Sequence, residues 1–129
     1  MASKVILIDT TILIDYFRKT DKENAALVAL VKQGYTYCIS SVTEYEIYRG
    51  VLPGQIEFWD NLLQKIEVLS FDKAASRIAV DIHFELKRKR KQIAIADLFI
   101  AATAIANNLK LSTLNKRHFD RIETLTLID

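Results

Sequence analysis

Short apolar runs alternate along this chain with longer segments in which apolar residues recur every three or four positions. The first run extends from Val5 to Asp9 and is continuous, which is typical of a strand buried on both faces. Strands that alternate with helices at this spacing predict a mostly parallel sheet with helices on both sides. We therefore expect an α/β fold, a three-layer α/β/α sandwich, formed by a single domain over residues 1–129.

The same pattern assigns the individual elements. Apolar runs predict strands over residues 5–9, 35–39, 67–69, 109–112 and 124–128. A period of 3.6 residues predicts helices over residues 10–17, 21–34, 40–50, 56–66, 72–91 and 93–108, and one helical turn over 117–119. Thr10 or Thr11 is the expected N-cap of the first helix. In folds of this class ligands bind at the carboxyl ends of the strands, where Asp9 and Asn115 are predicted to lie.

Composition narrows the class of protein. Half of the 129 residues are hydrophobic, 26% are charged and the net charge is +2, which describes a folded globular chain and gives no overall signal for nucleic acid. Cys38 is the only cysteine, so no internal disulfide can form and a reducing cytoplasm is the expected location. The most apolar window falls short of the roughly 20 residues of a membrane span, and no signal peptide is recognisable, so we expect no membrane contact.

Three acidic residues stand beside apolar elements. Asp97 is the only charged residue between Gln92 and Ala106, and a carboxylate there is costly to desolvate unless a cation, a partner or a cleft compensates it. Asp9 ends the first apolar run, and Glu46 follows the second strand. Together they predict one acidic site that holds a metal ion.

Each acid also has a structural interpretation. Asp9 could cap the helix behind it, although two threonines there offer capping oxygens of their own. Glu44 lies two positions before Glu46 and so points about 200° away from it on a helix. Glu46 shares the side of Val42 and Tyr45, which makes it the more inward of the two. The acid inside the apolar window could form an internal pair with a lysine or an arginine.

The ligand types indicate which metal to expect. Carboxylate oxygens without paired histidines or cysteines favour Mg²⁺ or Mn²⁺ over zinc. His83 and His118 are far apart in the sequence and show no zinc-binding spacing. Mg²⁺ held by a few carboxylates commonly binds phosphate oxygens as well, and metal-assisted phosphodiester cleavage uses that property.

Three segments together resemble a known family. They are ILIDTTILIDYF, ISSVTEYEIYRG and IAIADLFIAATAIANNLKLSTLNKRHF, and in order and spacing they are similar to the PIN-domain ribonucleases, most closely the VapC toxins of bacterial toxin–antitoxin pairs. The resemblance implies an endoribonuclease that depends on Mg²⁺ or Mn²⁺ and has RNA as its substrate. It also implies a small antitoxin partner whose C-terminal segment plugs the active-site groove, and surface that could serve a homodimer.

The same resemblance assigns site residues. It makes Asp9, Glu46 and Asp97 the metal ligands and places the hydroxyl groups of Thr10 and Thr113 along the site.

One position departs from the family pattern. Many members carry a fourth acid shortly after the fourth strand, where this chain has Thr113-Leu114-Asn115. The amide oxygen of Asn115 could orient a water molecule at the metal as a further catalytic group; alternatively, Asn115 is a plain turn residue. Our hypothesis is that one ion binds at rest and that any second ion arrives with the RNA phosphate.

Basic residues form two clusters that could bind RNA. The first is a run of five cations at the end of a long predicted helix: Lys87, Arg88, Lys89, Arg90 and Lys91. The second follows Asn115 and comprises Lys116, Arg117 and His118, with the histidine expected to contact phosphate rather than to act as a general acid. Such clusters supply sequence-independent, salt-sensitive affinity for RNA, although the first could equally be a solvated helix end. Arg49 is a candidate for contact with RNA or with a partner's carboxylate, or for a surface salt bridge.

Two other functions fit parts of the sequence. Phosphoaspartyl chemistry would suit an apolar strand that ends in Asp9. However, position 11 is threonine where dehalogenase-like phosphatases need an acid, and no acid precedes Asp9 as response-regulator receivers require. The second alternative is a non-catalytic PIN-like module that binds RNA or protein, which the missing fourth acid suggests.

Overall fold

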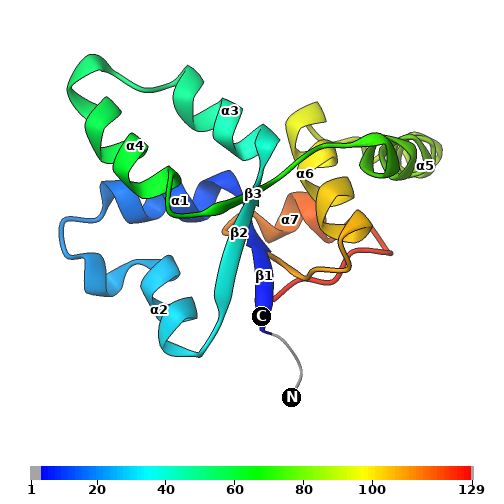
Figure 1. Cartoon of the computed structure of the whole chain (residues 1–129). Coiled ribbons are helices and arrows are strands. Elements are labelled where there is room, and N and C mark those ends of the chain that lie inside the picture. The colour runs from blue at the N-terminus through cyan, green and yellow to red at the C-terminus, as the bar shows by residue number, and fades with distance from the viewer. Residues whose placement is uncertain (1–3, 129) are drawn as a thin grey trace.

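Four parallel strands form one sheet at the centre of the molecule (Figure 1). The computed structural model describes residues 4–128. Within them the sheet has the order β3-β2-β1-β4, and its strands are β1 (Val5–Ile8), β2 (Thr36–Ser40), β3 (Glu67–Leu69) and β4 (Leu111–Ser112). In the register of the sheet, Ile6 pairs with Tyr37 and Leu7 pairs with Leu111. β1 is therefore a central strand, flanked by β2 and β4.

Helices connect the strands in the order that the sequence predicts. Among residues 4–128 they are α1 (Thr10–Arg18), α2 (Ala26–Lys32), α3 (Ser41–Arg49), α4 (Ile56–Leu63), α5 (Lys73–Lys89), α6 (Ile95–Ala106) and α7 (Lys116–Phe119), with two 3₁₀ turns, η1 (Lys22–Asn24) and η2 (Pro53–Gln55). In this part of the chain no helix combines the length and the apolar character needed to cross a membrane.

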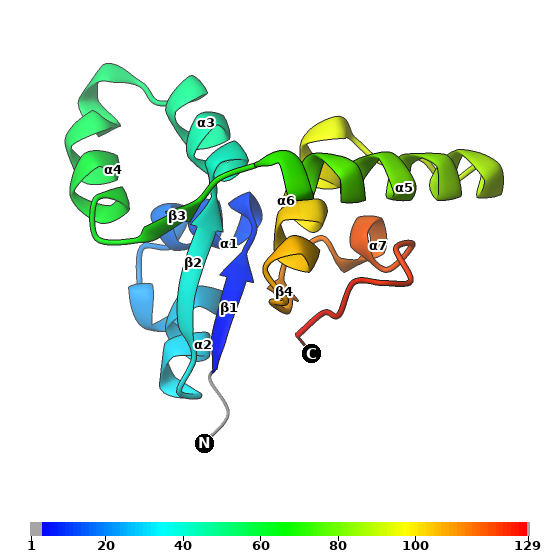
Figure 2. The same cartoon turned by 45° about the vertical axis from the view of Figure 1, so that its right-hand side comes forward.

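The sheet is covered on both faces because the side chains of its central strand alternate between two cores. Leu7 packs into a core with buried residues of α5, α6 and α7. Ile6 and Ile8 point the other way, into a core with buried residues of α1, α2, α3 and α4. Figure 1 shows α1, α2 and α4 on one side of the strands and α5, α6 and α7 on the other, and in Figure 2 α5 and α7 stand clear of the strands. The predicted three-layer sandwich with a parallel sheet is confirmed.

The predicted fifth strand, over residues 124–128, is wrong. Only Leu127 pairs with the sheet, through an isolated parallel bridge to Leu111. β4 itself is two residues long and offers little edge to pair with. The segment before the bridge folds in turns, and these bury Ile122 and Leu125 against the core beneath α5 and α6. Tertiary burial has replaced strand pairing here.

The predicted helix over residues 21–34 is divided into two. Asp21 accepts a hydrogen bond from the backbone N–H of Glu23 at 3.1 Å and caps only η1. Ala25 is extended, and α2 begins at Ala26, whose N–H donates to the carboxylate of Asp15 at 2.9 Å. The second cap comes from α1, eleven residues earlier in the chain, so the local pattern alone could not reveal it.

Cys38 provides a test of the core. The thiol is 1% exposed and donates to the carbonyl oxygen of Ile6 at 3.4 Å, and burial, together with the charge of Glu67, raises its pKa to about 11. The reactive thiolate is therefore scarce at mildly alkaline pH. We expect a thiol-specific chromogenic reagent to leave the native protein unlabelled and to react with one equivalent of thiol after denaturation. Equal labelling rates in native and denatured protein would contradict this packing.

Candidate functional site

Three elements bring carboxylates to one end of the sheet. Asp9 follows β1 directly, Glu46 lies on α3 behind the end of β2, and Asp97 lies in the first turn of α6. All three line one groove, whose volume is about 570 Å³. The predicted convergence of these acids in one site is thus observed. Figure 1 shows α1 and α3 starting from the same ends of β1 and β2.

Asp9 is the most enclosed of the three acids, with 2% of the residue exposed. One carboxylate oxygen accepts from the backbone N–H and the hydroxyl of Thr11, at 3.1 and 2.5 Å. The other accepts from the hydroxyl of Thr113 at 2.7 Å. Asp9, and not Thr10 or Thr11 as predicted, is the N-cap of α1. The prediction failed because it treated capping and membership of the site as alternatives, whereas the two carboxylate oxygens of Asp9 serve both.

Burial raises the pKa of Asp9, the hydrogen bonds from Thr11 and Thr113 oppose that rise, and the nearby charge of Asp97 adds to it. The two threonines are neutral donors, so they hold the carboxylate without cancelling its charge. An ionised Asp9 beside a second carboxylate favours the arrival of a cation.

Glu46 is held by a hydroxyl group on the neighbouring helix. Thr10 donates from its Oγ1 to Glu46 Oε1 at 2.6 Å and also lies 3.1 Å from Thr43 Oγ1. The reasoning that placed Glu46 on an inward side with Tyr45 is wrong in part, because Tyr45 is 62% exposed. Glu46 reaches the groove because α3 passes beside the start of α1, while Glu44 does not line it.

Asp97 is paired with a histidine and not with the lysine or arginine considered from the sequence. Its side chain is 20% exposed, and its Oδ2 lies 3.3 Å from Nδ1 of His118. The side-chain nitrogen of Asn115 lies 2.7 Å from the same ring nitrogen. Asn115 does not line the groove, so it reaches the acids through His118.

The chemistry of the three carboxylates suits a divalent cation, but their present arrangement does not bring all three together around one ion. Hard carboxylate oxygens suit Mg²⁺ or Mn²⁺. Within residues 4–128, however, no three acidic, histidine or cysteine side chains are close enough together to hold an ion as they stand. Glu46 is turned toward Thr10, and the charge of Asp97 acts on Asp9. Residues that could hold the ion are therefore present, with Glu46 engaged elsewhere.

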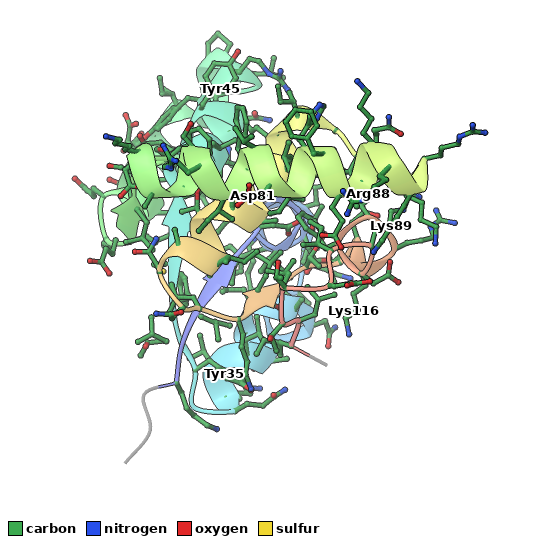
Figure 3. The ribbon with its side chains drawn as sticks, turned by 90° about the vertical axis from the view of Figure 1, so that its right-hand side faces the viewer. Tyr35, Tyr45, Asp81, Arg88, Lys89 and Lys116 are labelled. Atoms are coloured by element: carbon green, nitrogen blue, oxygen red, sulfur yellow. The ribbon has the colours of Figure 1, made fainter. Side chains whose placement is uncertain are left out.

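The predicted RNA-binding residues do not line this groove. Residues 87–91 are exposed at the end of α5 (Figure 3 labels Arg88 and Lys89), and Lys89 forms ion pairs with Glu85 at 3.1 Å and Glu123 at 2.7 Å. Lys116 and Arg117 are exposed on α7. Arg49 lies over the ring of Tyr45, 5.6 Å from its centroid. Their role in RNA binding stays a prediction.

Sequence reasoning identified only Thr10 on the side of α1 that lines the groove. It missed the other lining residues of this helix, which recur three or four positions apart: Thr11, Ile14, Asp15, Arg18 and Lys19. A helical period starting at the acidic end of the first strand was the available signal, and it would have added two basic residues to the site.

The model of the PIN domain matches residues 6–125 of this chain. The chain belongs to the PIN-domain family. Ribonuclease VapC1 from Methanocaldococcus jannaschii is 35% identical over 95% of this chain and 84% of its own length. Ribonuclease VapC10 from Mycobacterium tuberculosis is 33% identical, over 94% and 90%. The solved structure of DNA-bound VapBC from Salmonella typhimurium superimposes with a TM-score of 0.83 at 27% identity, covering 99% of this chain and 98% of that chain. The family indicated by the three sequence segments is confirmed.

A buried hydroxyl in this PIN domain provides a test of how Asp9 is held. Thr113→Val keeps the shape and removes the donor to the carboxylate, and a lost hydrogen bond to a charged group costs about 2 kcal/mol. We expect that loss in urea unfolding of the metal-free protein at neutral pH. The difference in unfolding free energy between the variant and the wild type should become smaller as the pH falls. The hydrogen bond favours the ionised form of Asp9, and because the pKa of Asp9 is raised, this carboxylate becomes protonated at a higher pH than an ordinary aspartate.

Thr103→Val is the matched control. Thr103 is equally buried, but its hydroxyl donates only to the carbonyl oxygen of Phe99 within α6, at 2.8 Å. Its removal should cost less than about 1 kcal/mol and show no such pH dependence. Equal losses in the two variants would mean that Thr113 acts only as a packed side chain.

Proposed function

We propose that this protein is a metal-dependent endoribonuclease of the VapC type, the toxin of a toxin–antitoxin pair, with its catalytic centre at Asp9, Glu46 and Asp97. The observation that carries the proposal is the convergence of these three carboxylates in one groove at the end of a parallel sheet. Its support is membership of the PIN-domain family and relatives along nearly the whole chain that are named ribonucleases.

The ion is proposed to be Mg²⁺ or Mn²⁺, held by Asp9, Asp97 and Glu46. When bound, it would stabilise charge on the phosphate and make water a better nucleophile. The chain's own residues prepare the site. Thr11 and Thr113 fix the two oxygens of Asp9, and Thr10 fixes Glu46. These neutral donors orient the acids and preserve their negative charge for the cation.

Asn115 has a supporting role in this proposal. Its contact with His118, which in turn contacts Asp97, supports the third acid. This is one way in which an amide could serve where many family members have a fourth acid. A direct contact with the attacking water belongs to the same proposal and would require the Asn115 amide to turn toward the groove.

The partners follow from the comparisons. We propose RNA as the substrate, because the relatives are named ribonucleases, and a small antitoxin as the partner, because VapBC structures share the fold over nearly the whole chain. A homodimer and a location in the cytoplasm complete the proposal. Residues 87–91, Lys116, Arg117 and Arg49 are retained as candidates for contacts outside the groove.

Asp97→Asn tests the catalytic centre. The variant keeps the size and the polar contact to His118 but loses a charged ligand. We expect cleavage of total RNA in Mg²⁺ or Mn²⁺ to fall by more than about a hundredfold. Mutation of residues that only support the ligands of a metal already lowers metal affinity or activity about 10–100-fold, and Asp97 is itself a proposed ligand. EDTA should abolish cleavage by the unmodified chain.

Asp81→Asn is the control, since Asp81 is exposed on α5 (Figure 3) and does not line the groove. It should cut RNA at the wild-type rate. If the wild-type chain binds RNA and never cuts it in any divalent metal, the non-catalytic module becomes the better interpretation.

Metal binding can be measured apart from activity. A ligand present at a hundred times its Kd stabilises the folded state by about 2.7 kcal/mol, so Mn²⁺ should raise the Tm of the wild-type protein. Asp9→Asn should remove most of that shift. The shift should also shrink as the pH is lowered, because the raised pKa of Asp9 lets protons compete with the ion at a higher pH than for an ordinary aspartate. An unchanged shift in Asp9→Asn would place the ion elsewhere.

A further inference from the structure

The groove has a cationic end as well as an acidic one. Along α1, Thr10, Ile14 and Arg18 lie four residues apart and share the side of the helix that faces the groove. The helix begins at Asp9, so the acids lie at its first turn and Arg18 at its last. At about 1.5 Å of rise per residue, Asp9 and Arg18 are separated by about 13 Å along the axis.

Arg18 is the cation in this groove that remains available to a ligand. Within residues 4–128 its exposed guanidinium has no hydrogen bond and no ion pair. Lys19 beside it lies 3.7 Å from the carboxylate of Asp15. Lys22, which follows, is held by the carbonyl oxygens of Tyr16, Phe17 and Lys19 at 2.5, 2.9 and 2.8 Å. The neighbouring cations are thus already engaged by the protein, and Arg18 is not.

A guanidinium group is suited to an anion with paired oxygens. Its planar fork of N–H donors matches a phosphate in two parallel hydrogen bonds, which an ammonium cannot do. A polymer with regularly repeated anions fits a groove that would hold one phosphate over the acids and another near Arg18. The separation of about 13 Å corresponds to roughly four stacked nucleotides at 3.4 Å each, and to fewer when the strand is extended.

We propose that Arg18 binds an RNA phosphate a few nucleotides from the scissile bond, so that the RNA strand lies along α1. This inference rests on the proposed endoribonuclease function and adds a substrate-binding residue to it. It gives the groove a direction, from the acids to the end of α1. It also gives the substrate a minimum length, because an RNA too short to span the groove cannot reach Arg18.

This path leads away from the cationic run on α5. In Figure 1, α1 lies on one side of the sheet and the outer end of α5 on the other. An RNA strand that follows α1 therefore extends away from residues 87–91. The affinity for a short oligonucleotide in the groove should depend on Arg18, whereas the cations of α5 can contact only longer RNA.

Binding of labelled oligouridylates by fluorescence anisotropy tests the assignment. The protein carries Asp97→Asn to prevent cleavage, and Mg²⁺ is present throughout. Arg18→Gln should weaken binding of an octanucleotide severalfold and lower the slope of log K against log salt concentration by about 0.7, the value for one phosphate contact to a single strand. A dinucleotide should bind equally well to both proteins. Arg18→Lys should keep most of the salt slope.

Arg77→Gln is the matched control, because Arg77 is an exposed arginine on α5 with no described partner and does not line the groove. It should leave both oligonucleotides unaffected. In the cleavage assay, with Asp97 intact, Arg18→Gln should raise KM with little change in kcat, because the contact is made in the ground state and the transition state alike.

The failures are distinguishable. Equal octanucleotide binding by Arg18→Gln and Arg77→Gln would overturn the role of Arg18 alone if the wild-type chain still cuts RNA. The guanidinium of Arg18 would then be available to an acidic group of a protein partner. Equal loss for the dinucleotide and the octanucleotide would also overturn it, since that result indicates a general change in charge or fold. A wild-type chain that neither binds nor cuts RNA would overturn the proposed function together with this inference.

Discussion

The buried carboxylate of Asp9 is the constraint on which the arrangement of this molecule depends. β1 is enclosed on both faces, so the first polar residue after it emerges inside the protein, at the end of the sheet. A charge in that position requires donors for both oxygens. Thr11 supplies them from the start of α1, and Thr113 supplies one from beyond β4. The pairing of β1 with β4 brings these two parts of the chain together.

Hydroxyl groups, not lysine or arginine, are the partners of Asp9 and Glu46. Asp9 and Glu46 are each held by threonine, and Asp97 by a histidine that a neutral amide contacts. An arginine at any of these positions would have offset the negative charge that a metal ion needs. The cations Arg18 and Lys19 stand instead at the far end of α1. The charge of the groove is thus separated along one helix, with negative charge where a cation is needed and positive charge where an anion can lie.

The sequence was sufficient for the features that depend on local pattern. The two-faced burial of β1 and the parallel sheet follow from the apolar runs. The convergence of Asp9, Glu46 and Asp97 was indicated by acids that stand beside apolar elements. The sequence pattern could not predict the features that depend on contacts between residues far apart in the chain. Residues 124–128 have the composition of a strand, but a two-residue β4 cannot hold one. Likewise, Asp15 caps α2 from α1, and the histidine beside Asp97 lies 21 positions away in the sequence.

The hydrogen bond between Thr113 and Asp9 joins residues that are 104 positions apart. During synthesis Asp9 is made first, and it lacks this donor and the β4 neighbour of its strand until Thr113 has left the ribosome. Asp97 is also made after Asp9. A nascent or truncated chain that stops before Thr113 therefore cannot hold the acids as the folded protein does. The order of synthesis delays the assembly of the site until β4 and Thr113 have been added.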